Sequence, residues 1–334
     1  MKRTFALEGA RPVHLNRLRA FVRVVECGSF SRAARSLGLT QPAVSQQIKS
    51  LEALLGTRLL VRGSDAVGLT PAGQRVLPYA RRILQLWDAL VDETRDEASG
   101  ALSGRLAVGA STVPAGYLLG DLIGRFRRRH PRIDVTVRVA DSAGVVAWVQ
   151  EDRVDCGATG MRVPVPGVDH VVFARERLSV ITPPDHPWAG RTVRPADLAA
   201  VPLVWRERGS GTRQAAEEAL LRWGIDPRDI PVAAEVGSTE AVVGAVQAGL
   251  GLALISSLAA KTAMAAGRVG VARVDGPPAE REFYFIYKAT RAGEPLLAAF
   301  LGFVREWAQD ASGPARLGAV TGSDGDGPKD GLLS

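Results

Sequence analysis

The sequence predicts a multidomain protein: an N-terminal all-α winged helix-turn-helix, a long linker helix, and a C-terminal α/β domain of two subdomains. Three observations predict it. The first 70 residues hold eleven Lys and Arg against four Asp and Glu, which equals the whole chain's net charge of +7. Apolar residues recur at helical spacing up to about residue 97, and strand-like and helical runs alternate beyond it. The length of 334 residues, 46% of them hydrophobic, suits two or three domains.

A basic head on a neutral body is typical of a nucleic-acid-binding module joined to a second function, because neutralised phosphates supply most non-specific affinity. A merely solvated basic face is the alternative that charge leaves open. The longest apolar stretch, 248–260, is too short to cross a bilayer, so we expect a cytoplasmic protein without membrane contact. Cys27, Cys156 and four scattered histidines lack ligand spacing, so we expect no metal, disulfide or cofactor.

The head is expected to contain three helices, over residues 15–27, 31–37 and 41–55, after an N-terminal tail at 1–14. Glycines stop these helices and hydroxyl residues cap them, at Gly28, Ser29, Gly38, Thr40 and Gly56. Pro42 suits the first turn of the third helix. A helix, a tight glycine-containing turn and a second helix have the spacing of a helix-turn-helix.

A wing and a long helix complete this part of the chain. Residues 59–61 read as a strand, 63–68 as a hairpin tip and 69–73 as the return, which defines a domain over 15–73. The helix at 71–97 carries a seven-residue repeat, interleaved with further apolar residues: Leu77, Ala80, Leu84, Trp87 and Val91. This spacing predicts a dimerisation helix. The alternative is that the stripe packs onto its own domain.

The small, flexible segment at 98–104 is the expected boundary before the α/β body at 104–310. We expect subdomain I at about 104–174 and 281–310, subdomain II at about 175–280, and a disordered, Gly-rich tail at 311–334.

The motifs LRAF, GSFSRAARSLGLTQPAVSQQIKSLEALLG, RLLVR and LTPAG stand in order in the head. The body carries FRRRHP at 126–131, RERGSGTR at 206–213 and GSTEAVVGAVQAGLGLALIS at 237–256. On these residues the chain resembles the LysR-type transcriptional regulators from residue 15 to about 308. The segments at 206–213 and 237–256 are most similar to the subgroup that regulates carbon fixation and sulfur assimilation. Asp65 departs from the family, in a wing where a second basic residue is common.

The resemblance implies a homotetramer built as a dimer of dimers, with double-stranded DNA and RNA polymerase as partners. It implies a periplasmic-binding-protein-like effector domain, in which a small, anionic effector binds between the subdomains. The expected function is therefore ligand-responsive transcription regulation, and the chain is not expected to be an enzyme.

The third helix is expected to lie in the major groove, with its N-terminal polar face toward base edges. Gln46 can bond an adenine edge bidentately, while arginines of the second helix suit phosphates. The candidate DNA-binding residues are Ser29, Arg32, Arg35, Thr40, Gln41, Pro42, Ser45, Gln46, Lys49 and Arg62. The alternative for each is an ordinary exposed polar residue.

The turn at 209–213 brings amides, hydroxyls and a guanidinium to a helix N-terminus, which is the chemistry of an anion seat. Other hydroxyls stand at strand-to-helix joins. The candidate effector-binding residues are Ser111, Thr112, Ser142, Thr159, Ser210, Gly211, Thr212, Arg213 and Ser238. Helix capping is the alternative role for each of them.

Two other functions stay open on the sequence. One is a constitutive DNA-binding protein that takes no effector. The other is an enzyme on the α/β body with Ser210 or Thr212 as nucleophile, for which the sequence offers no adjacent base.

Overall fold

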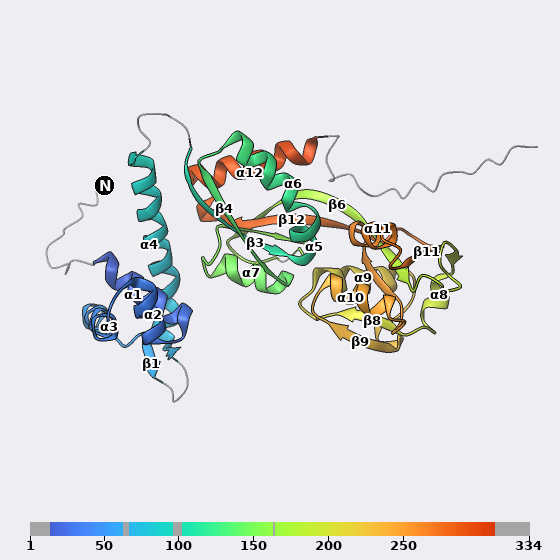
Figure 1. The fold of residues 1–334 in the computed structure, drawn as a ribbon, viewed down its shortest axis with the longest axis horizontal. Coiled ribbons are helices and arrows are strands. Elements are labelled where there is room, and N and C mark those ends of the chain that lie inside the picture. The colour runs from blue at the N-terminus through green and yellow to red at the C-terminus, as the bar shows by residue number, and fades with distance from the viewer. Residues whose placement is uncertain (1–13, 63–66, 96–101, 163, 311–334) are drawn as a thin grey trace, which may run out of the picture.

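The computed structural model describes residues 14–62, 67–95, 102–162 and 164–310. A small head, the long helix α4 and an α/β body follow one another along the chain (Figure 1). Residues 1–13 of the predicted tail at 1–14, the predicted tail at 311–334, residues 63–66 of the predicted wing tip at 63–68 and residues 98–101 of the predicted boundary at 98–104 lie outside the described residues.

The head confirms the predicted helix-turn-helix. Its helices are α1 (Leu15–Cys27), α2 (Phe30–Leu37) and α3 (Gln41–Leu55). Each is followed by a glycine in the left-handed conformation, namely Gly28, Gly38 and Gly56. The Ser29 hydroxyl accepts a hydrogen bond from the amide of Arg32, and the Thr40 hydroxyl accepts one from the amide of Ala43. Both predicted caps are therefore present.

A two-stranded wing packs on this core. The strands β1 (Leu60–Arg62) and β2 (Val67–Leu69) pair antiparallel, and α4 (Pro71–Arg95) follows. The start of α4 needs a glycine, because a Cβ on Gly73 would lie 2.1 Å from the carbonyl oxygen of Leu59. Phe21, Val44 and Leu59 are fully buried in the head core.

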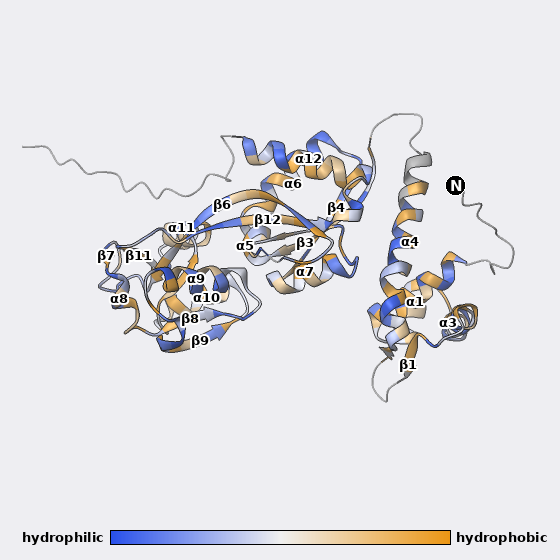
Figure 2. Ribbon diagram, turned by 180° about the vertical axis from the view of Figure 1, so that it is seen from behind, coloured by the Kyte–Doolittle hydropathy of each residue, from blue (hydrophilic) through white to orange (hydrophobic). Residues whose placement is uncertain are grey.

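The predicted seam on α4 divides between two faces. Leu77 and Ala80 are buried in the head core, and Leu84 packs against that core. The alternative of packing onto its own domain is therefore correct for this part of the stripe. A different apolar row, which shares Trp87 with the predicted seam, stays exposed along α4: Tyr79, Ile83, Leu86, Trp87 and Leu90. Figure 2 shows hydrophobic and hydrophilic residues interspersed along this helix.

α4 also contacts the body through polar groups. Arg81 donates a hydrogen bond to the carbonyl oxygen of Glu151 at 3.2 Å, and Arg82 forms an ion pair with Glu294. These contacts attach the linker helix to subdomain I.

The body is built on a mixed sheet. Within the described residues eight strands join in the order β4-β3-β5-β12-β6-β11-β7, with β10 also paired to β6. Parallel pairs connect β3 (Gly104–Ser111) to β4 (Ile133–Ala140) and to β5 (Cys156–Thr159). A separate parallel pair joins β8 (Leu203–Arg206) and β9 (Val232–Val236).

Two long strands connect the two lobes of the body (Figure 1). These are β6 (Val168–Thr182) and β12 (Glu280–Lys288), which pair antiparallel. The N-terminal part of β6 pairs with β12, and its C-terminal end pairs with β10 (Ala253–Ser256) and β11 (Gly270–Val274). The predicted subdomain limits at 174/175 and 280/281 lie on these two strands.

Helices cover both lobes. Subdomain I carries α5 (Thr112–Tyr117), α6 (Leu119–Arg129), α7 (Ser142–Gln150) and α12 (Pro295–Gln309). Subdomain II carries α8 (Pro195–Leu198), α9 (Gly211–Arg222), α10 (Thr239–Gln247) and α11 (Ser257–Ala265), with the short strand β7 (Thr192–Val193). The apolar stretch at 248–260 forms β10 and the start of α11. Among the described residues no helix combines the length and apolarity needed to span a membrane.

Candidate DNA-binding and effector-binding sites

Helix α3 separates an apolar face from a polar one. Val44, Ile48 and Leu51 are buried against α1 and α2, as the helical spacing predicted. The predicted base-reading side of α3 carries the exposed Gln41, Pro42, Gln46 and Lys49, with Ser45 half-buried between them. This is the arrangement that a recognition helix needs, because the polar face is open while the apolar face fixes its orientation.

The predicted phosphate contacts lie on α2 and at helix starts. Arg32 and Arg35 are exposed, and neither forms an ion pair with any residue that the structure describes. Ser29 and Thr40 act as helix caps, so their hydroxyls already hold backbone amides. Arg62 lies on β1, and its side chain is outside the described residues.

The predicted effector residues stand where parallel strands of both subdomains end. Ser111 ends β3, Thr159 ends β5, and Ser142 begins α7 after β4. In subdomain II, Ser210 caps α9 after β8 and Ser238 caps α10 after β9. Open α/β sheets bind ligands at this edge, outside the carboxyl ends of the strands.

One pocket collects most of these residues. Its lining includes six predicted members from both subdomains: Ser111, Thr112, Ser142, Ser210, Gly211 and Thr212. Arg206, Arg281 and Phe283 line it too, although the sequence did not nominate them. The cavity measures about 10 Å³, which is about the room that one water molecule requires. The two subdomains are therefore closed on each other here.

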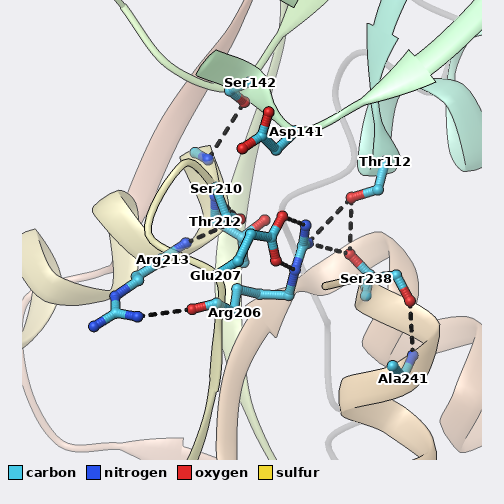
Figure 3. A network of polar contacts seen from close by, with 12 residues as sticks. Thr112, Asp141, Ser142, Arg206, Glu207, Ser210, Thr212, Arg213, Ser238 and Ala241 are labelled. Atoms are coloured by element: carbon cyan, nitrogen blue, oxygen red, sulfur yellow. Dashed lines mark hydrogen bonds and ion pairs between the residues drawn. The ribbon is translucent and has the colours of Figure 1, made fainter. Parts of the chain in front are cut away.

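Arg206 joins the two subdomains at this pocket. It is 4% exposed, and its Nη1 donates hydrogen bonds to Thr112 Oγ1 of subdomain I at 3.1 Å and to Thr239 Oγ1 of subdomain II at 2.9 Å. The Nε and Nη2 atoms bind the carboxylate of Glu207 at 2.8 and 2.6 Å (Figure 3). This is bidentate geometry, which is strong and directional.

Arg281 comes from the crossing strand β12. Its Nε lies 2.7 Å from Glu176 Oε1 on β6, and its Nη1 donates to Thr212 Oγ1 at the start of α9. Glu176 also accepts a hydrogen bond from Ser256 at 2.6 Å. This buried network links both crossing strands to the N-terminus of α9, and so to the floor of the pocket.

Backbone contacts close the pocket edge between the 141–144 and 209–211 segments. The Gly211 amide donates to Ser142 Oγ at 3.3 Å, and the Ala143 amide donates to the carbonyl oxygen of Gly209 at 3.2 Å. A Cβ on Gly211 would lie 2.8 Å from the backbone carbon of Gly160, so glycine permits this approach.

Family comparisons agree with this architecture. Residues 15–74 match the model described as "Bacterial regulatory helix-turn-helix protein, lysR family", and residues 99–309 match "LysR substrate binding domain". The chain belongs to the LysR family. The "RuBisCO operon transcriptional regulator" of Allochromatium vinosum is 35% identical over 87% of this chain and 95% of that protein.

Two solved LysR structures resemble most of the chain. The crystal structure of CbnR, a LysR family transcriptional regulator, gives a TM-score of 0.67 at 26% identity over 89% of this chain and all of that one. Full-length CbnR complexed with its target DNA gives 0.66 at 26% identity, over 88% of this chain and all of that one. These matches and the two family models identify the chain as a LysR-type DNA-binding transcriptional regulator with an effector-binding domain, and its relatives are named as regulators rather than enzymes.

Three predicted effector residues of this LysR domain lie outside the pocket lining. Arg213 turns away from Thr112 (Figure 3) and pairs with Glu217 at 2.8 Å and Glu235 at 2.6 Å. Burial lowers the pKa of the Arg213 guanidinium, but hydrogen bonds to those carboxylates outweigh it and raise the pKa overall. Thr159 accepts a bond from the amide of Met161, and Ser238 caps α10. Ser238 therefore has the helix-capping role that the sequence left open as the alternative, whereas Thr159 holds a turn.

Arg206 and Arg281, which the sequence analysis did not nominate, differ in the sequence signal that could have identified them. Arg206 stands in the RERGSGTR segment, so the family motif contained the signal, but the sequence argument assigned the guanidinium role to Arg213 instead. Arg281 lies 68 positions after Arg213 on another strand, and only the antiparallel pairing of β12 with β6 brings it to the pocket.

The hydroxyls of Ser210 and Thr212, the candidate nucleophiles of the enzyme alternative, already accept hydrogen bonds within the protein. Ser210 Oγ accepts from the amides of Thr212 and Arg213, and Thr212 Oγ1 accepts from Arg281. An amide and a guanidinium cannot act as general bases, so these contacts give no activation of either oxygen.

Proposed function

We propose that this cytoplasmic LysR-type regulator responds to a small anion held between its subdomains by Arg206 and Arg281, together with the hydroxyls and amides of the 111–112, 142 and 210–212 segments. The carrying observation is that two buried guanidinium groups converge on one pocket lined by both subdomains. Buried arginine with bidentate geometry is suited to carboxylate, phosphate and sulfate groups.

The DNA-binding half of the proposal rests on α3. Gln46, Ser45 and Lys49 read bases and nearby phosphates in the major groove, while Arg32 and Arg35 bind backbone phosphates. The exposure of Gln46, Lys49 and both arginines supports these roles.

The exposed apolar row on α4 supports a dimer, and through it a tetramer. Tyr79 is 73% exposed and Leu90 is 51% exposed, which is costly for a helix facing water. A second copy that covers this row forms the dimer, and two dimers form the tetramer. Dimerisation places two recognition helices on two half-sites, so their spacing is set by the protein.

The effector acts by favouring one arrangement of the subdomains over another, since a ligand with equal affinity for both arrangements shifts nothing. Because α4 is bonded to subdomain I through Arg81 and Arg82, a rotation of that subdomain moves the helix that carries the head. The expected readout is a change in half-site spacing or DNA bending, with the base contacts retained.

The test is a footprint of the purified protein on DNA upstream of its own gene, with and without small carboxylates, phosphorylated sugars and inorganic oxyanions. Protection that shifts with one compound supports the proposal. Arg206→Ala should keep the protection and lose the shift, whereas Arg213→Ala, outside the pocket, should keep both. Suppose that no compound changes the protection, and that none of these anions binds the wild-type protein in a separate binding titration. That result would favour the constitutive regulator instead.

A further inference from the structure

Two arginine–glutamate pairs border the same pocket, and they are built differently. The Arg281–Glu176 pair is closed from water, with side-chain exposures of 5% and 1%. In the Arg206–Glu207 pair the arginine side chain is 3% exposed but the glutamate side chain is 24% exposed. Only the second pair therefore has a partner that reaches solvent.

The two carboxylates are also anchored differently. Glu176 accepts hydrogen bonds from Arg281 and from Ser256, which come from separate elements. Among the described residues the Glu207 carboxylate bonds to Arg206 alone, its own chain neighbour. Rotation of the Glu207 side chain can release this pair, whereas releasing Glu176 would break contacts among β6, β10 and β12.

Arg206 has almost no donor capacity left. Its Nη1 hydrogens serve Thr112 and Thr239, and its Nε and Nη2 edge serves Glu207 (Figure 3). A guanidinium has five N–H donors, and these bonds use four of them. An anion that enters the pocket cannot gain a bidentate contact with Arg206 while Glu207 stays in place.

We infer that Glu207 is a built-in competitor for the effector: its carboxylate occupies the Nε–Nη2 edge of Arg206, and an anionic effector must displace it into solvent to bind. This inference rests on the proposed function, and it adds that Glu207 sets how strongly an effector must bind Arg206 to enter the pocket. The exchange swaps one oxyanion for another on the same edge, while the Nη1 bonds to both subdomains persist.

The competition also selects among ligands. A monocarboxylate offers Arg206 the charge and geometry that Glu207 already supplies, so it gains little by exchange. A phosphate group with two negative charges and three free oxygens binds the same edge more strongly. The favoured class is therefore a dianionic oxyanion rather than a simple monocarboxylate.

The test is titration calorimetry of the full-length protein with inorganic phosphate and with acetate, in a low-chloride buffer. Glu207→Gln keeps the shape of the side chain and removes its charge, so the Kd for phosphate should fall by about tenfold or more. Glu207→Asp keeps the charge on a shorter side chain and should give an intermediate Kd. The matched control is Glu235→Gln, which removes a carboxylate from Arg213 outside the pocket and should leave the phosphate Kd unchanged.

The direction of the effect separates this role from a structural one, because a variant that merely loosens the domain would bind phosphate more weakly. Equal phosphate affinity in the wild type and in Glu207→Gln would overturn the inference and leave the anion-responsive regulator standing. An equal gain in Glu235→Gln would also overturn it, since the effect would then reflect net charge. If neither the wild type nor Glu207→Gln binds phosphate or acetate, both the proposed function and the inference about Glu207 are overturned.

Discussion

The recognition helix and the effector pocket present polar groups in opposite ways. On α3, Gln46 and Lys49 are exposed and ready to meet DNA. In the pocket, Arg206, Ser210 and Thr212 are at most 4% exposed, and each already has hydrogen-bond partners within the body. On the proposed function, DNA binding by α3 needs little rearrangement of the head, whereas effector binding in the pocket must replace bonds that the body already makes.

This difference suits a regulator. A preformed head can bind DNA both with and without effector. A pocket whose polar groups already bond to its own side chains responds only to a ligand that binds those groups more strongly.

The largest effect is expected from Arg281→Met, because it leaves the carboxylate of Glu176, 3% exposed, without its cation. Breaking a buried pair from one side costs about 3–5 kcal/mol. Urea unfolding followed by tryptophan fluorescence measures it, since all tryptophans but Trp87 lie in the body. The double variant Glu176→Leu/Arg281→Met should recover most of the loss. If the single variant unfolds like the wild type, the buried network does not stabilise the body.

On the head, Gln46→Ala should weaken binding to the operator by about 1–3 kcal/mol, the value of one bidentate base contact. The stability of the Gln46→Ala protein should hardly change, since the Gln46 side chain is exposed. Fluorescence anisotropy with operator and with unrelated DNA separates the effects. Equal weakening on both DNAs would show that Gln46 does not read sequence.

The two helix caps allow a direct comparison of the same local motif. Thr40 is exposed on the head and Ser210 is 3% exposed in the pocket, and each hydroxyl accepts from backbone amides at a helix start. Replacing either by alanine should cost about 1 kcal/mol of stability. Only Ser210→Ala should alter the phosphate Kd in calorimetry. A change in that Kd for Thr40→Ala would mean that the head and the pocket are energetically coupled.

The head was almost fully predictable from sequence, and the body was not. Local rules fix the head: Gly28, Gly38 and Gly56 stop helices, and Ser29 and Thr40 cap them within a few residues. In the body, the sequence predicted only an alternation of strand-like and helical runs, and it did not predict how β5, β10 and β11 pair in the sheet. β5 and β10 are short and buried at every position, so they lack alternation, and in β11 only Ala272 is buried. Sheet pairing rather than local pattern decides these strands.

The same difference between local signals and long-range pairing explains which residues of the candidate site could be predicted. Ser210, Gly211 and Thr212 were found because a capped turn is a local signal. Arg213 was predicted for the effector site but does not line this pocket, because its side chain pairs with Glu217 and Glu235. Arg281 reaches the pocket only through a crossing strand. The α4 stripe was partly misread, since Leu77 faces the head core and Leu86 faces outward.

The smallest expected effect concerns Arg32, which we assign to a DNA phosphate. Arg32→Ala should weaken binding to all DNA sequences alike and lower the slope of log K against log salt by about 0.9, because one counterion fewer is released. Anisotropy titrations across a salt series measure the slope, with Arg23→Ala as the control: that side chain is also exposed, but it pairs with Glu26 on α1. An unchanged slope for Arg32→Ala would remove it from the interface, whereas a reduced slope for Arg23→Ala would extend the interface onto α1. Either result locates the phosphate contacts of the preformed head without involving the effector pocket.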